Sequence, residues 1–156
     1  MKSESRKFTM TAIAGIITVW SIFTMYSNAP FYIEITKATQ GMEVTLIEFQ
    51  KVDETTILLT FEFENTSSLD ITLNSLIFNL YANSEFMGNF GMRERKILPP
   101  GNTTVMMVAD VQERYIEELP TGQSIQWTVN GGAVIELPME EEVTYTIPIT
   151  AGWVTL

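Results

Sequence analysis

Residue types that carry out catalysis or bind transition metals are scarce in this sequence. It contains no histidine and no cysteine. The commonest general base near neutral pH, the thiolate nucleophile and the usual ligands of zinc and copper are therefore missing. Serine–histidine and cysteine–histidine nucleophiles and zinc hydrolases are excluded. We predict a chain with no catalytic residues, no cofactor and no metal, which is not an enzyme.

Carboxylates are the reactive groups that the chain does have in number, since 19 Asp and Glu stand against 9 Lys and Arg. Glu136, the run Glu140 to Glu142 and the pair Glu117 and Glu118 offer oxygens for calcium. Calcium needs six or more converging oxygens, and consecutive residues of a strand point to opposite faces. We therefore expect a solvated acidic hairpin. The net charge of −10 also disfavours nucleic acid as a partner.

Two triplets match the acceptor pattern for N-glycosylation. They are Asn65-Thr66-Ser67 and Asn102-Thr103-Thr104, and both fall where turns are expected. Asparagine also supplies side-chain hydrogen bonds to turns without carrying a sugar. Glycosylation of Asn65 and Asn102 is thus one of two open interpretations.

One basic cluster lies beyond the first thirty residues. Arg93, Arg95 and Lys96 in the stretch RERK precede Pro99-Pro100-Gly101, and we expect the cluster to lie at the top of a hairpin. It offers a contact for an acidic neighbour or for phospholipid headgroups, or it is a solvated loop.

The element nearest the N-terminus is an uncharged segment, Phe8 to Tyr26, which follows Lys2, Arg6 and Lys7. At about 1.5 Å per residue a helix over it spans about 28 Å, close to the hydrocarbon thickness of a bilayer. Its Ser and Thr hydroxyls can bond to carbonyls of the preceding turn. We predict a transmembrane helix over residues 8–26, with residues 1–7 as a cytoplasmic tail. The lipid bilayer is then the first partner.

Orientation follows from the charges that flank this segment. Positive charge precedes it and none follows closely, so the positive-inside rule places the N-terminus in the cytoplasm and the C-terminal part outside. We predict that Pro30 ends the helix and that residues 27–41 form a linker. A signal peptide cleaved after Ala29 is the alternative. The apolar run exceeds the usual length of a signal-peptide core, which favours an uncleaved anchor.

Period-two alternation dominates the chain from Met42 onward. Ile57, Leu59, Phe61 and Phe63 share one parity while polar residues take the other, as in a strand with one wet face. Similar patterns predict strands over 42–50, 71–82, 103–111, 124–129, 133–137 and 143–149. Turns are expected at VDE, NTSSLD, LPPGN, LPTGQ and NGG, and one helical turn at ERYIEELP. We predict an antiparallel β-sandwich of about seven strands over 42–150, with a C-terminal tail at 151–156.

Two local features refine this prediction. Ile71 and Leu73 are odd-numbered whereas Leu76, Phe78 and Leu80 are even, which indicates a β-bulge near Asn74-Ser75. The stretch TFEFENTSSLDITL (residues 60–73) breaks its alternation at Asn65. We expect it to turn the chain between two paired strands.

Four stretches in order resemble a known family. They are FEFENTSSLDITLNSLIFNLYANSEFMGNF, ILPPGNTTVMMVADV, WTVNGGAVIEL and VTYTIPI. They are similar to the water-stress and hypersensitive-response (WHy) domain of the type-2 late embryogenesis abundant proteins. This sequence has Thr66 where the family often has Pro, and Asn83-Ser84 where it often has Asn-Gly. The resemblance implies a sandwich of about seven strands with a short helix, often behind one membrane span, with no catalytic residues and a link to stress tolerance.

Taken together, we predict a non-enzymatic, membrane-anchored extracytoplasmic sandwich that acts in binding, structural support or stress protection. The absence of His and Cys and the many isoleucines incline us to an archaeal source. The alternative is an accessory single-span subunit of a larger membrane complex. Small residues, Gly15 with Ala12 and Thr11 with Thr18, would then face other helices.

Overall fold

The computed structural model describes the backbone of residues 2–120 and 122–155, and the side chains of these residues from Ile13 onward. The chain divides into two compact units, Met1–Glu34 and Ile35–Leu156. The first unit is helical. The second holds the end of the same helix and all the strands.

Helix α1 (Lys2–Gln40) has no Asp, Glu, Lys or Arg between Phe8 and Ile33. Within its described residues 13–29, three hydroxyls bond to carbonyls four residues earlier, as the sequence predicts. They are Thr18 to Ala14 O at 2.9 Å, Thr24 to Trp20 O at 2.9 Å and Ser27 to Phe23 O at 2.8 Å.

The predicted span, Phe8–Tyr26, lies only partly in the described side chains, because those of residues 8–12 fall outside them. Over the part that is described, no helix is both long enough and apolar enough to cross a membrane.

The prediction that Pro30 ends the helix is wrong, since α1 continues through it to Gln40 and residues 27–40 are helical. Proline lacks the N–H that would bond to the carbonyl of Tyr26, a cost of about 3 kcal/mol in a helix interior. Tertiary packing offsets this cost, because Ala38 is fully buried and Ile35 packs against the core of the sandwich. Gly41 N then donates to Lys37 O at 2.8 Å and closes the last turn.

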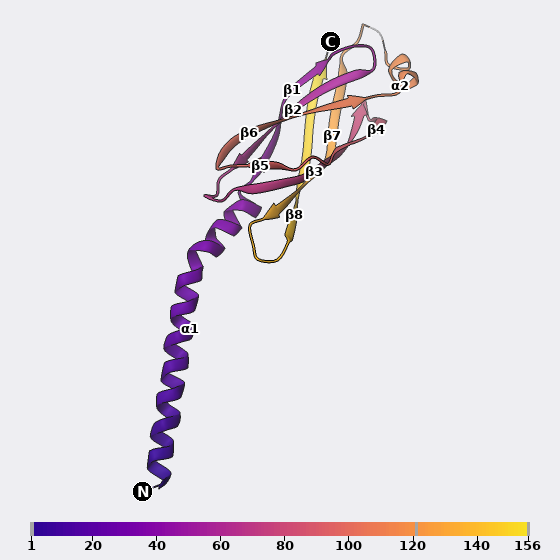
Figure 1. Ribbon diagram of the computed structural model, residues 1–156. Helices are drawn as coiled ribbons and strands as arrows, with labels where there is room; N and C mark the ends of the chain where they lie inside the picture. Colours follow the sequence, from indigo (N-terminus) through magenta and orange to yellow (C-terminus); the bar gives the residue numbers. More distant parts are fainter. Residues whose placement is uncertain (1, 121, 156) are drawn as a thin grey trace. The chain divides into compact units, whose positions relative to one another are not determined.

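Eight strands form two antiparallel sheets, which confirms the predicted β-sandwich class (Figure 1). One sheet has the order β1-β2-β6, and the other has the order β4-β3-β7-β8 with β5 also paired to β3. The strands are β1 (Glu43–Lys51), β2 (Thr56–Asn65), β3 (Ile71–Ala82), β4 (Glu85–Met92), β5 (Lys96–Leu98), β6 (Gly101–Asp110), β7 (Ile125–Leu137) and β8 (Val143–Thr155). The predicted helical turn is α2 (Glu113–Glu117).

The core is built from the side chains that the alternation pattern marked. Ile57, Leu59, Phe61 and Phe63 of β2 are at most 1% exposed. The bulge near Asn74 is confirmed, because the register of β3 with β7 shifts between Leu73 and Ser75. The residues of β3 on both sides of the shift therefore face the same core.

Three predicted features of the sheets differ in the structure. The sequence does not predict strands β4 and β5. The two strands that it predicts over 124–129 and 133–137 are parts of one strand, β7 (Ile125–Leu137), which runs straight through the expected NGG turn. Strand β8 extends to Thr155, where a tail was expected. Gly131 explains the second difference: a side chain there would clash with the backbone of Ile77 and Phe78 on β3, so the glycine permits close strand approach.

The stretch after Asn65 connects the two sheets, so the prediction that it joins two paired strands is wrong. β2 pairs with β1 and β6, whereas β3 lies in the other sheet. The Asn65 side chain is buried and donates to Leu69 O at 2.8 Å and to Leu98 O at 3.0 Å. These bonds join the segment between β2 and β3 to the end of β5. Alternation along the sequence does not predict this contact.

Candidate partner-binding site

The basic cluster lies in a break within one edge of the five-stranded sheet. β4 and β5 both run antiparallel to β3, with Met92 opposite Leu76 and Lys96 opposite Leu73. Arg93 and Arg95 therefore lie between two collinear strands, and the expected hairpin top is wrong. The bulge at Asn74 lies opposite this break, since β3 has an extra residue there.

Arg95 is held by a carboxylate from a distant strand. Its Nη2 lies 2.7 Å from Glu136 Oε2 of β7, with the two side chains 61% and 22% exposed. Asn74 Nδ2 donates to the same oxygen at 3.0 Å, while its buried Oδ1 has no hydrogen-bond partner among the described residues. An exposed ion pair of this kind contributes about 0–1 kcal/mol, so it orients Arg95 more than it stabilises the fold.

Lys96 bonds across to the other sheet. Its Nζ donates to Thr104 O of β6 at 2.6 Å, and the side chain stays exposed. Arg93 is exposed as well. The three predicted contact residues therefore lie together at the edge of the sandwich, two of them oriented by their own chain.

A groove of about 280 Å³ opens beside Arg95 and Lys96; we call it the basic groove. Its lining consists of Met92, Glu94, Arg95, Lys96, Val105 and Met106. The volume is below the usual range for small-molecule and cofactor sites. Met92, Val105 and Met106 give the groove apolar walls, and Arg95 and Lys96 lie at its rim together with the acidic Glu94. A groove of this size suits one or two side chains of a partner.

Other predicted site residues lie elsewhere. Asn65 Nδ2, the atom that would carry a sugar, is buried and already donates two hydrogen bonds, and this geometry disfavours glycosylation there. Asn102 is exposed at the start of β6, and its glycosylation stays a prediction. Glu140 to Glu142 are exposed between β7 and β8, and no three acidic residues in the described part gather in a way that could hold a metal ion.

Asp53 lies in the turn between β1 and β2, outside the groove, and its carboxyl has a lowered pKa. Backbone N–H groups of Thr55 (2.9 Å) and Thr56 (2.7 Å) donate to Asp53 Oδ1 and lower the pKa of that carboxyl below its ordinary value. This is the expected chemistry of an Asx-type turn and indicates a structural role.

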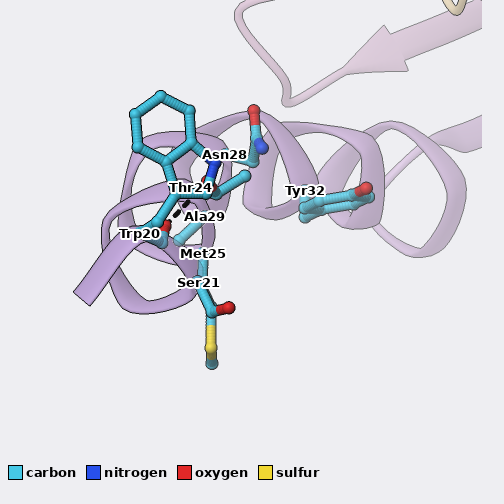
Figure 2. Close-up of a pocket in the computed structure, with 7 residues that line it drawn as sticks. All are labelled: Trp20, Ser21, Thr24, Met25, Asn28, Ala29 and Tyr32. Atoms are coloured by element: carbon cyan, nitrogen blue, oxygen red, sulfur yellow. Dashed lines mark hydrogen bonds between the residues drawn. The ribbon is translucent and has the colours of Figure 1, made fainter. Parts of the chain in front are cut away.

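A second depression lies on α1 (Figure 2). Figure 2 shows Trp20, Ser21 and Thr24 at one end and Tyr32 at the other, with the bond from Thr24 Oγ1 to Trp20 O dashed. The full lining is Trp20, Ser21, Thr24, Met25, Asn28, Ala29 and Tyr32.

The sequence did not predict two sets of residues in and beside the groove. Asn74 and Glu136 orient Arg95, but they are far apart in the chain and only the strand register brings them together. Met106, which lines the groove from β6, is 67% exposed, and Val108, which lies outside the groove, is 56% exposed. Their even numbering within β6 was the available signal, because the buried residues Val105, Met107 and Ala109 are odd.

Comparisons with known proteins support the fold alone. The solution structure of a protein proposed to be a late embryogenesis abundant (LEA) protein aligns with 88% of this chain and 86% of its own, at 13% identity and a TM-score of 0.56. A solution structure from Arabidopsis thaliana aligns with 72% of this chain and 76% of its own, at 17% identity and a TM-score of 0.52. A protein from Archaeoglobus fulgidus aligns at a TM-score of 0.47, which is too low to add to the argument.

No protein-family model and no curated protein matches the chain. The resemblance to the LEA and WHy proteins is thus confirmed at the level of fold, and membership of the family stays a prediction.

Proposed function

We propose that this chain is a non-enzymatic β-sandwich anchored in the cytoplasmic membrane by α1, with its N-terminus inside and the sandwich outside. It acts by binding or structural support near the membrane. The LEA-like fold supports a role in stress protection. The basic groove, with Arg93, Arg95 and Lys96, is its contact for an acidic neighbour.

The observation that carries the anchor is the uncharged, exposed surface of α1. A helix that is apolar on all sides is buried in lipid or in protein. The exposed large apolar side chains of its described part include Ile13, Ile16, Ile17, Val19, Trp20, Ile22, Phe23, Met25 and Tyr26. The hydroxyls of Thr18, Thr24 and Ser27 are bonded within the helix, which lowers the cost of placing them in hydrocarbon.

The charges that flank α1 support the orientation. Lys2, Arg6 and Lys7 precede the uncharged stretch, and the next charged residue is Glu34. The positive-inside rule counts Lys and Arg near the ends of a span, so the N-terminal end is the cytoplasmic one.

Alkaline carbonate extraction of membranes that contain the full chain tests the anchor. We expect the chain to stay in the membrane pellet with its N-terminus intact. An Ile16→Arg, Ile17→Arg variant should shift to the supernatant, because each Arg at a helix centre costs about 2.5–3.5 kcal/mol of insertion. Thr45→Arg, Gln50→Arg in the exposed face of β1 is the matched control and should stay in the pellet. Release of the unmodified chain, or a mature N-terminus at Pro30, would contradict the anchor.

An accessory subunit of a larger membrane complex is the second candidate. The depression in Figure 2 favours it, because Ser21, Asn28 and Ala29 are small or polar and offer a helix face for packing. The predicted faces at Ala12 and Thr11 lie outside the described side chains. Extraction in mild detergent followed by mass measurement decides: stoichiometric partner chains support the subunit, and the chain alone supports the free-standing protein.

A further inference from the structure

Strand β6 presents an unpaired backbone edge. It is the outer strand of the sheet β1-β2-β6, and among the described strands it pairs with β2 alone. Val111 N donates to Thr55 O at the end of this ladder, so the odd-numbered residues of β6 bond to β2. The N–H and C=O groups of Met106 and Val108 therefore point away from β2, toward the free side, whereas Thr104 O on that side already accepts from Lys96 Nζ at 2.6 Å.

The other long edge strands carry features that block pairing, and β6 carries none along its centre. β1 has a bulge between Leu46 and Glu48, β4 has a register shift opposite Leu80 and Tyr81, and β8 contains Pro148. Bulges, prolines and charges are the usual means by which sheets avoid edge-to-edge association. β6 has a regular register along its length and no charge or proline before Asp110. An edge of this kind is a template on which another strand can pair.

The solvent face of β6 is apolar at its centre and charged near its ends. Met106 and Val108 are 67% and 56% exposed. Lys96 lies against Thr104 O near the first end. Asp110 lies at the other end, where its Oδ1 accepts a 3.4 Å hydrogen bond from Thr56 Oγ1. An antiparallel second β6 brings the basic end of each copy to the acidic end of the other, whereas a parallel one places like charges together.

We propose that two copies of this chain pair through β6, antiparallel, with Met106 of each copy opposite Val108 of the other. This register also places Thr104 opposite Asp110, so each Lys96 ammonium meets an Asp110 carboxylate. The outward N–H and C=O groups of Met106 and Val108 form the central hydrogen bonds. The interface is isologous, so it closes as a dimer and does not propagate.

This pairing rests on the proposed function in one respect only, that this edge of the sandwich binds protein. It does not need the membrane anchor. Confinement of the chain to a membrane would raise its effective concentration and favour the dimer.

The chain has no cysteine of its own, so any disulfide in a cross-linking test forms between introduced cysteines. In the proposed register, Cα atoms of residues 106 and 108 on opposite copies lie about 5.5 Å apart, within disulfide range. Residue 106 and its own equivalent lie about 8–9 Å apart, outside that range. We therefore prepare the full-length Met106→Cys and Val108→Cys variants separately in mild detergent and oxidise each alone and as a mixture.

We expect the mixture to cross-link at least fivefold more than either variant alone. Adding Met106→Lys to the Val108→Cys partner should abolish this gain, because lysine blocks edge pairing. Ile77→Lys, an exposed apolar position on the central strand β3, is the matched control and should leave the gain intact. A mixture that cross-links no more than the single variants overturns the proposal, as does an edge occupied by a different co-purifying chain. Because cross-linking is read in detergent, its failure is distinct from failure of carbonate extraction.

Discussion

Asn65 joins the two sheets through a single amide group. Its Nδ2 donates to Leu69 O and Leu98 O, while its Oδ1 accepts from Ser67 N at 3.1 Å and Ser67 Oγ at 2.7 Å. Asn65 and Ser67 are 2% and 3% exposed. All four hydrogen-bonding positions of the amide are filled within the protein, so the crossing between β2 and β3 has one defined path.

Replacing Asn65 tests this role. We expect Asn65→Ala to lower the free energy of unfolding by about 2–4 kcal/mol, because the buried carbonyl of Leu98 and the partly buried carbonyl of Leu69 lose their donor. Asn102→Ala, at the other glycosylation triplet, is exposed and should change it by less than about 0.5 kcal/mol. Urea unfolding of both variants in the same detergent is the measurement. Equal stability of the two variants would show that the amide network does not hold the crossing.

Strand β7 depends on the absence of a side chain at one point. Gly131 lies opposite Phe78 in the ladder with β3, and a Cβ there would clash with the backbone of Ile77 and Phe78. The neighbouring β8 has Gly152, where a Cβ would meet only Trp127 O at 3.8 Å. The two glycines therefore differ in what they do for the sheet.

We expect Gly131→Ala to destabilise the sandwich by about 2–3 kcal/mol, since backbone atoms must move apart to admit the methyl group. Gly152→Ala should be neutral within about 0.5 kcal/mol. Thermal unfolding followed by circular dichroism compares them. A small effect at Gly131 would mean that β3 and β7 shift without loss of packing.

Strand patterns were predictable where one face is buried and the other wet. The parity of β2 and the flip in β3 led directly to the core and to the bulge at Asn74. β4 (Glu85–Met92) was missed because its small residues Gly88 and Gly91 and its half-exposed Phe86 hide the alternation. The sequence predicts a turn at NGG, inside β7, because glycine marks both turns and close strand approach. For the site, charge alone located Arg93, Arg95 and Lys96, whereas the partners Glu136 and Thr104 required the strand register.

At the scale of the whole molecule, the compact unit that holds the strands extends beyond the predicted 42–150 at both ends. It begins at Ile35, and its first residues are the last turn of α1. Ala38 is fully buried, and Thr66 Oγ1 donates to Gly41 O at 3.2 Å. At the other end Trp127 Nε1 donates to Thr155 Oγ1 at 2.9 Å.

Two fragments of the chain test whether the folded unit is residues 35–156 or residues 42–150. We expect residues 35–156 to unfold cooperatively in urea without detergent. This fragment keeps all the strands and the end of α1, whose Ile35 and Ala38 pack on them. Residues 42–150 should be less stable by at least about 3 kcal/mol. That fragment exposes the surface that Ile35 and Ala38 cover and leaves the Trp127 indole without its partner, at about 25 cal/mol per Å² for the apolar part. Two further fragments, 35–150 and 42–156, show which end of the chain accounts for the lost stability. If fragments 35–156 and 42–150 are equally stable, the predicted domain bounds of 42–150 are correct and the end of α1 serves only as a linker.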